Sequence, residues 1–200
     1  NSPDPLDLIA KYGADGVRVG MLFSSPAGND LPFDESLCEQ GRNFANKIWN
    51  AFRLVNGWKE TDGKDGIDNR DYTKITEWFD AKLKSETAVI NDLYAKYRIS
   101  EALMATYKLI WDDFCSWYLE IVKPGIGMAM KEETYLLTIS YFESLLKLLH
   151  PFMPFITEEI WQSISERKSG ESIMMKQWPE VGENKTLILN DFSSAMELVT

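Results

Sequence analysis

The sequence predicts a mainly α-helical fold, in which a small and partly irregular N-terminal module precedes a helical bundle of about four or five long helices. Apolar residues recur at helical spacing along most of the chain, and typical start and stop residues bracket each such stretch. With 44% hydrophobic and 12% aromatic residues among its 200, the chain has enough large side chains for a substantial core. We find no internal repeat or low-complexity segment in the sequence.

The first two predicted helices are short. Asp4 is a suitable N-cap, Pro5 suits the first helical position, and Gly13 is a typical stop. A second helix is expected over Ala14 to Phe23, followed by a loop of small and polar residues at 24–31. The chain starts NSPDP without an initiator Met and stops within an amphipathic pattern, so we expect it to be a segment of a longer protein.

A long helix is predicted next. Asp34 is expected to cap it, and its apolar periodicity continues to about Val55. Gly41 is a candidate bend within this helix, and Asn56–Gly57 is the expected stop. The acidic, glycine-containing stretch at 60–71 is then expected to be a solvated loop.

The rest of the chain is expected to be mostly helical. Four more helices are predicted, over residues 73–97, 100–121, 131–149 and 155–167. Ser100 is the expected cap of the second of these helices. Short extended segments are predicted at Ser172 to Trp178 and at Leu187 to Leu189, and Asn190 or Asp191 is expected to cap a last helix.

The charge and cysteine content restrict the class of protein. A formal net charge of −10 argues against a nonspecific polyanion binder, so any contact with nucleic acid must lie where acids are locally absent. Cys38 and Cys115 are too few for a disulfide framework and lack zinc-binding spacing, so we expect two reduced, buried thiols in a cytosolic protein. No apolar run approaches the roughly 20 residues needed to span a bilayer, and no membrane partner is expected.

The sequence offers no convincing site for bond-making chemistry. The single His150 has no partner at diagnostic spacing, so a structural role at a helix end is favoured over that of a general base or metal ligand. Neighbouring acids such as Glu158 and Glu159 point in different directions on a helix and suit a solvated face or the helix dipole. Neither a phosphate-binding glycine loop nor a nucleophile motif is found.

Two sets of aromatic residues have competing interpretations. One set lies at helical spacing and is expected to pack in the core, although it could stack bases: Trp111, Phe114, Trp117 and Tyr118. Trp49 lies at the edge between the apolar and polar faces of the predicted long helix. It could pack against a neighbour or lie beside a nucleotide, and packing is favoured.

The stretch from Gly41 to Lys59 is the clearest candidate for an interface. It carries four basic residues and no acid over 19 residues, and its asparagines lie at 43, 46, 50 and 56. A surface of this kind is most often simply solvated. Asparagine, however, offers a donor and an acceptor to a base edge, and Lys or Arg attracts phosphate. We therefore expect the polar face of this helix to bind RNA.

These residues resemble the class I valyl-tRNA synthetases (valine–tRNA ligases) over nearly the whole chain. The segment ending in DGVR resembles the one that directly follows the family's KMSKS catalytic loop. The motifs that carry the resemblance are DGVR at 15–18, RNFANKIWN at 42–50, FCSWYLE at 114–120 and HPFMPFITEEIW at 150–161. This chain departs from the family in Gly16 and Val17 of the first motif and in Ser116, where Asp is usual. The last motif also recurs loosely in isoleucyl and leucyl relatives.

The resemblance implies a C-terminal fragment of an ATP-dependent, Mg-requiring ligase that joins valine to its tRNA. The HIGH and KMSKS signatures are absent here, so we expect no catalytic residue, cofactor or metal in this fragment and no aminoacylation by it alone. The expected divisions are a stem-contact module at 1–40, a helical anticodon-binding bundle at 41–170, and a return segment with the start of a truncated helix at 171–200. The expected partner is valine tRNA, through its anticodon loop and stem, bound by a cytoplasmic monomer.

The resemblance also gives the predicted interface a target. Valine anticodons end in A and C, and the family binds these bases with the helix that matches Gly41 to Val55. The residues expected to contact RNA are Lys47, Asn43, Asn46, Asn50 and Leu54 at the bases, with Arg42 and Arg53 at the backbone. Leu54 stands where some relatives carry an aromatic residue, and leucine offers only van der Waals contact to a base.

Two alternatives remain open at this point. The fragment could come from an isoleucyl- or leucyl-tRNA synthetase, which anticodon swaps would distinguish. It could also be a helical protein-interaction module without RNA contact, which would need a large exposed apolar patch.

Overall fold

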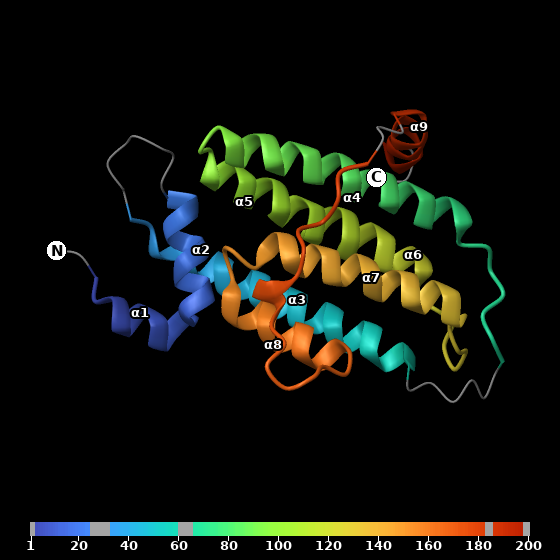
Figure 1. Ribbon diagram of the computed structural model, residues 1–200, viewed down its shortest axis with the longest axis horizontal. Helices are drawn as coiled ribbons and strands as arrows, with labels where there is room; N and C mark the ends of the chain where they lie inside the picture. Colours follow the sequence, from blue (N-terminus) through green and yellow to red (C-terminus); the bar gives the residue numbers. More distant parts are fainter. Residues whose placement is uncertain (1–2, 25–32, 60–65, 183–185, 198–200) are drawn as a thin grey trace.

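The computed structural model describes residues 3–24, 33–59, 66–182 and 186–197, and Figure 1 shows them as a helical bundle with a small module at one end. In chain order the elements are α1 (Pro5–Tyr12), α2 (Ala14–Ser24), α3 (Glu35–Lys59), α4 (Thr73–Ala95), α5 (Ile99–Lys108), the π-helical segment η1 (Leu109–Tyr118), α6 (Leu119–Val122), α7 (Glu132–Leu149), α8 (Pro154–Ile164), the 3-10 turn η2 (Ile173–Met175) and α9 (Thr186–Glu197). The described residues contain no strand, only an isolated bridge between Ile67 and Ala129. The predicted mainly helical class is therefore confirmed.

Several expectations fall partly or wholly beyond the described residues. All but the first residue of the expected loop at 24–31, and the first half of the loop expected at 60–71, lie outside the described residues.

The described helices include none that is both long and apolar enough to cross a bilayer.

The N-terminal module begins as its sequence predicts. The Asp4 carboxylate accepts a hydrogen bond of 2.8 Å from the Leu6 amide, which caps α1. Gly13 ends this helix with a φ of 75°, a conformation that favours glycine. Asp34 caps α3 in the same way, through a 2.9 Å bond from the Ser36 amide.

The stop predicted for α3 at Asn56–Gly57 is wrong, because the helix continues to Lys59. Trp58 is only 7% exposed and joins the core of the bundle, and its burial holds the last turn in place. Gly41 is also not simply a bend. A methyl group at Gly41 would lie 2.5 Å from the Gly16 carbonyl oxygen, so these glycines allow the backbones of α2 and α3 to touch.

The single helix predicted over 100–121 is divided in the structure. It begins at Ile99, one residue before the expected cap Ser100, and its middle part is η1. The wider turns of η1 are visible in the bond from the Ser116 hydroxyl to the carbonyl of Trp111, five residues earlier. Apolar periodicity alone cannot distinguish a π-helical stretch of this kind from an α-helix.

The C-terminal part differs most from the prediction. Helix α8 ends at Ile164 instead of near Arg167, because the Arg167 guanidinium folds back over the Trp161 ring at 3.7 Å and bonds its carbonyl. Ser172 to Trp178 does not form a strand and contains the turn η2. Leu187 to Leu189 are helical, not extended, and belong to α9, so the cap expected at Asn190 or Asp191 is wrong too.

Helix α7 lies at the centre of the bundle, where it packs against α3, α4, α5 and α8. The largest fully buried side chains come from six elements and include Phe44, Phe79, Phe114, Tyr118, Phe142 and Trp161. Tyr118 shares a 2.9 Å hydrogen bond with Thr138, which satisfies both buried hydroxyls. At the edge of the bundle, Phe192 of α9 stacks on Trp78 of α4 with ring centroids 4.1 Å apart.

Two charged side chains of α2 fasten the N-terminal module to the bundle. The Asp15 carboxylate accepts hydrogen bonds from the amides of Ile156 and Phe155, at 2.7 and 3.3 Å, and so caps the first turn of α8. Arg18 donates to the carbonyl oxygens of Phe152 and Pro151, at 3.0 and 2.9 Å. The N-terminal module is therefore hydrogen-bonded both to the turn between α7 and α8 and to the start of α8.

The contact between α2 and α3 makes a testable prediction. Gly41→Ala should lower the free energy of unfolding by about 1–3 kcal/mol, because the added methyl group overlaps backbone that cannot move aside easily. Gly57→Ala in the same helix is the matched control, since no atom lies within 4 Å of its added methyl group. It should raise stability by up to about 1 kcal/mol through helix propensity. Urea unfolding followed by circular dichroism measures both, and equal effects would contradict the close contact.

Candidate nucleic-acid interface

The outward side of α3 carries the polar side chains that the sequence assigns to RNA. Its exposed members are Asn43, Asn46, Asn50 and Arg53, and its half-buried members are Arg42, Lys47 and Leu54. We call these seven residues the α3 face. On the opposite side of the helix, Phe44, Ile48 and Val55 have no exposed surface, so α3 has the amphipathic character that its spacing predicts.

The exposed members of the α3 face have unused hydrogen-bonding capacity. Within the described ranges, the side chains of Asn43, Asn46, Asn50 and Arg53 make no hydrogen bond or ion pair. Three amides each offer a donor pair and an acceptor, and the guanidinium offers donors alone. The four side chains follow one stripe of the helix over about three turns, because their spacings are three and four residues.

Lys47 is held more firmly than its neighbours. Its ammonium lies 5.2 Å from the centre of the Trp111 ring in η1, a distance at which the cation and the ring attract each other. Trp111 in turn stacks on Tyr107, with ring centroids 5.4 Å apart and planes 14° from parallel. Burial raises the pKa of the Cys115 thiol to about 12, and the Lys47 ammonium acts on it in the opposite direction, so this cation also lies near Cys115.

Arg42 is separate from the rest of the α3 face. Its guanidinium lies 5.6 Å from the centre of the Tyr12 ring of α1 and 3.4 Å from the Glu39 carboxylate. Its buried Nε–H has no acceptor in the described part of the chain. The structure therefore places Arg42 beside the N-terminal module, and it places the other six residues along the bundle.

Leu54 and the aromatic residues singled out by the sequence differ in how far they are buried. Leu54 and Trp49 pack against the core with part of their surface exposed, and Trp49 contacts Phe52 with ring centroids 5.3 Å apart. Phe114 and Tyr118 are fully buried, as the core interpretation predicts. Trp111 and Trp117 are only partly buried. Nothing in the sequence links Trp111 to Lys47, because the two lie 64 residues apart and only the packing of η1 on α3 joins them.

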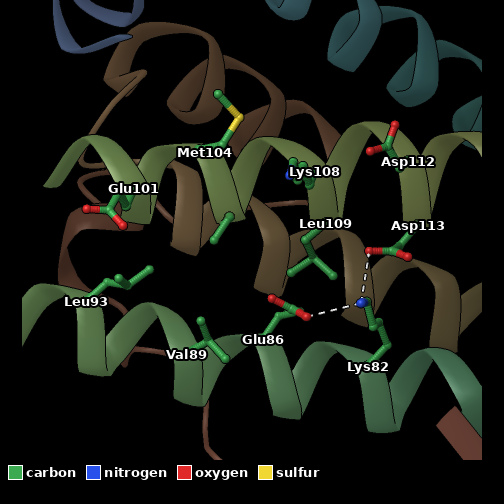
Figure 2. Close-up of a pocket in the computed structure, with 11 residues that line it drawn as sticks. Lys82, Glu86, Val89, Leu93, Glu101, Met104, Lys108, Leu109, Asp112 and Asp113 are labelled. Carbon is green, nitrogen blue, oxygen red and sulfur yellow. Dashed lines mark ion pairs between the residues drawn. The ribbon is translucent and has the colours of Figure 1, made fainter. Parts of the chain in front are cut away.

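A cleft with a volume of about 610 Å³ lies between α4 and the continuous helix formed by α5 and η1. Figure 2 shows side chains from both walls pointing into this space. Its apolar lining comes from Val89, Leu93, Met104, Ala105 and Leu109, and its charged lining from Lys82, Lys108, Glu86, Glu101, Asp112 and Asp113. Four carboxylates against two ammonium groups make this cleft repel a polyanion.

One lysine organises the charges in this cleft. Lys82 pairs with Glu86 at 3.1 Å and with Asp113 at 3.6 Å, which ties α4 to η1 (Figure 2). Burial raises the pKa of Asp113 to about 6, while the Lys82 ammonium opposes that rise. This cleft is thus a charge-bridged seam between α4 and η1, and the α3 face is the better candidate for contact with RNA.

The sequence's other chemical candidates have structural partners. His150 caps α7, and its Nδ1 lies 2.7 Å from the Thr157 hydroxyl of α8. Partial burial lowers the pKa of His150, which favours the neutral ring. The Glu158 carboxylate accepts bonds from Gln162, Ser172 and Ile173, which attaches the turn η2 to α8. Cys38 and Cys115 are both free and buried, as expected.

Comparison with known proteins gives a consistent picture. Residues 76–200 match the family model described as the anticodon-binding domain of tRNA ligase. The chain is 56% identical over 200 residues to valine–tRNA ligases of Phocaeicola vulgatus and Christiangramia forsetii, and 42% identical over 188 residues to that of Fusobacterium nucleatum. The alignments with the first two relatives cover 100% of this chain, and the alignment with the third covers 90%. The relatives are much longer, so this chain spans only 22% of each of the first two and 21% of the third.

A solved structure shares the fold. It is described as a ternary complex of Agrobacterium radiobacter K84 agnB2 LeuRS with tRNA and LeuAMS. The TM-score is 0.61 over 94% of this chain and 21% of that one, at 17% sequence identity. At this identity the similarity concerns the fold alone.

The charge seam in the cleft leads to a prediction on pH. A folded-state pKa of about 6 for Asp113, against about 3.9 in an unfolded chain, means that the folded state holds this proton more tightly. This group's contribution to stability is therefore present at low pH and is lost as the pH rises through 6. Carbon-detected NMR of the carboxyl group should show a midpoint near 6, and Lys82→Met should move that midpoint upward.

Asp71 provides the internal control for this titration. Hydrogen bonds from Thr73 lower the pKa of Asp71, so its carboxyl signal should shift at a pH below the usual range in both proteins. An Asp113 midpoint near 4, or one that does not respond to the loss of Lys82, would show that the seam is open to water.

Proposed function

The chain belongs to the family of anticodon-binding domains of tRNA ligases, and we propose that it is the anticodon-binding part of a valine–tRNA ligase. The identity of more than half of its residues to valine–tRNA ligases, over its whole length, supports this specificity. The one structural observation that carries the proposal is the α3 face, where three amides and Arg53 without partners, and Lys47 beside Trp111, line the outside of a helix that is firmly packed on its other side.

The proposal covers the parent protein as well as this chain. The parent would join valine to its tRNA with ATP and Mg in a part outside these 200 residues, as a cytoplasmic monomer. This chain alone would not aminoacylate. Within it, residues 1–40 would contact the tRNA stem, residues 41–170 would form the anticodon-binding bundle, and residues 171–200 would be a return segment leading into a truncated helix.

The α3 face would bind unstacked anticodon bases by hydrogen bonding and charge. Asn43, Asn46 and Asn50 present donors and acceptors that suit the edges of A and C. Lys47, held beside Trp111, would place its charge at a fixed point next to these bases, which costs less side-chain entropy than ordering a free lysine. Leu54 would add only van der Waals contact.

The two arginines would position the RNA backbone. Arg53 is exposed on the same stripe as the asparagines, whereas Arg42 lies beside α1. Phosphate contacts fix the orientation of the RNA but carry no sequence information. Arg42 is therefore suited to a contact toward the stem, and Arg53 to one nearer the anticodon loop.

The alternatives have less support. An isoleucyl or leucyl origin has only the distant structural similarity at 17% identity in its favour, against 56% identity to the valine enzymes. A protein-interaction module without RNA contact does not agree with the family match.

Removing the Lys47 charge tests the proposed base contact. Lys47→Ala should weaken binding of valine tRNA by about five- to 150-fold, the range for loss of one contact worth about 1–3 kcal/mol. Titration by fluorescence anisotropy at several salt concentrations measures this. Lys96→Ala is the matched control, because Lys96 is an exposed lysine directly after α4 that is already paired with Asp92. Unchanged affinity in Lys47→Ala, with unchanged circular dichroism, would contradict the assignment.

Changing the anticodon tests the amino-acid specificity. Replacing the middle A or the third C of the valine anticodon should weaken binding to the chain by about five- to a hundredfold per position, whereas replacing the first base should have little effect. The same tRNA body is used throughout, so stem contacts stay constant. Equal binding of all anticodons would limit the chain to stem and backbone contacts.

A further inference from the structure

A small cavity on another part of the bundle has the chemistry of a nucleotide site. It has a volume of about 270 Å³ and lies where the end of α7, the turn after it and the segment through η2 meet. Its lining residues are Lys147, His150, Pro151, Ile173, Met174, Lys176 and Trp178. None of them belongs to the α3 face.

The charge of this lining is unusual for so acidic a chain. None of its seven lining residues carries a carboxylate, whereas four other cavities among the described residues each have at least one. Lys147 makes no hydrogen bond or ion pair within the described ranges, so its charge is not compensated by a partner. Lys176 bonds Glu171 at 2.7 Å and its ammonium lies 5.3 Å from the centre of the Trp161 ring, which leaves two of its three donors without a hydrogen-bond acceptor.

An aromatic side chain, Trp178, lines the same cavity as these two lysines. The indole nitrogen of Trp178 donates a 2.8 Å hydrogen bond to Asn91 of α4, and its ring meets Tyr94 edge to face at 6.0 Å. These two contacts fix the orientation of the ring, yet Trp178 remains 38% exposed. A fixed and partly exposed indole offers a surface on which a base can stack.

His150 contributes a defined polar edge. The Thr157 hydroxyl donates its only proton to the Met153 carbonyl at 2.7 Å, so it must accept from Nδ1–H of His150. In the neutral ring, Nε2 is then an acceptor. The cavity therefore combines cations for a phosphate, an aromatic surface for a base and an acceptor for a hydroxyl or amino group.

We propose that this cavity binds a nucleotide, with its phosphate between Lys147 and Lys176 and its base against Trp178. The cations alone would accept any small anion, and a lysine in the last turn of a helix also stabilises the helix dipole. The exposed part of the Trp178 ring adds a preference for a phosphate that is attached to a planar base, because the base can stack on the indole. The proposal goes beyond the anticodon contact and does not depend on the α3 face.

Adenosine monophosphate (AMP) is a suitable probe, with adenosine and inorganic phosphate as its two halves. Each is titrated into the 200-residue chain at low salt, and the indole N–H signal of Trp178 is followed by NMR after assignment with Trp178→Phe. AMP should shift this signal and bind at least tenfold more tightly than either half. No shift at millimolar AMP would overturn the proposal, and binding of phosphate as tight as that of AMP would overturn the role of the base.

Lys147→Met is the informative variant, because it removes the charge without breaking any bond in the folded chain. It should weaken AMP binding at least fivefold and leave adenosine binding unchanged. Lys74→Met, which removes an exposed lysine at the start of α4, is the matched control for net charge. Equal losses in both variants would mean that AMP responds to overall charge, and would overturn the site.

Two further arms identify the source of the nucleotide and separate this proposal from the anticodon contact. Valine tRNA should displace AMP if the natural occupant is a nucleotide of that RNA, and AMP should stay bound if the occupant is a free nucleotide. Lys47→Ala should still bind AMP with unchanged affinity. Loss of AMP binding in Lys47→Ala would show that the two sites are not separate, and would overturn the proposal.

Discussion

Helices α2 and α3 touch through their backbones, and this contact joins the N-terminal module to the bundle. Gly16 and Gly41 let the two backbones touch, and Gly20 brings α2 equally close to Cys38. Asp15, one residue before Gly16, caps α8 at the same junction. One short helix thus contacts both α3 and the start of α8, so it helps to set the direction in which the α3 face points relative to the bundle.

Local charge matters more than net charge in this protein. Carboxylates gather in the cleft between α4 and η1, where Lys82 ties them together, and the α3 face on the other side of η1 has none. The segment η1 therefore separates an acidic surface from a basic one, with Trp111 beside Lys47 and Asp113 beside Lys82. A polyanion that approaches this side of the bundle is attracted to the α3 face and repelled by the cleft between α4 and η1.

The sequence predicts the structural features that depend on local chemistry. It does not predict those that depend on contacts between residues far apart in the chain. The caps at Asp4 and Asp34 and the buried side of α3 follow from residue type and spacing. The last turn of α3 does not, because the burial of Trp58 outweighs a local stop signal. The Lys47–Trp111 contact joins residues far apart in the chain, so no pattern in either segment could reveal it.

The π-helical turns of η1 have a consequence for how this chain can change in evolution. A π-helix accommodates more residues per turn than an α-helix, so it behaves like an insertion absorbed within a continuous helix. Loss of one residue here would tighten the π turns towards α-helical ones and leave the residues that follow in nearly the same orientation, so Tyr118 would stay beside Thr138. Trp111, near the start of η1, would keep its place beside Lys47. A one-residue deletion in η1 would thus spare both the core and the surface.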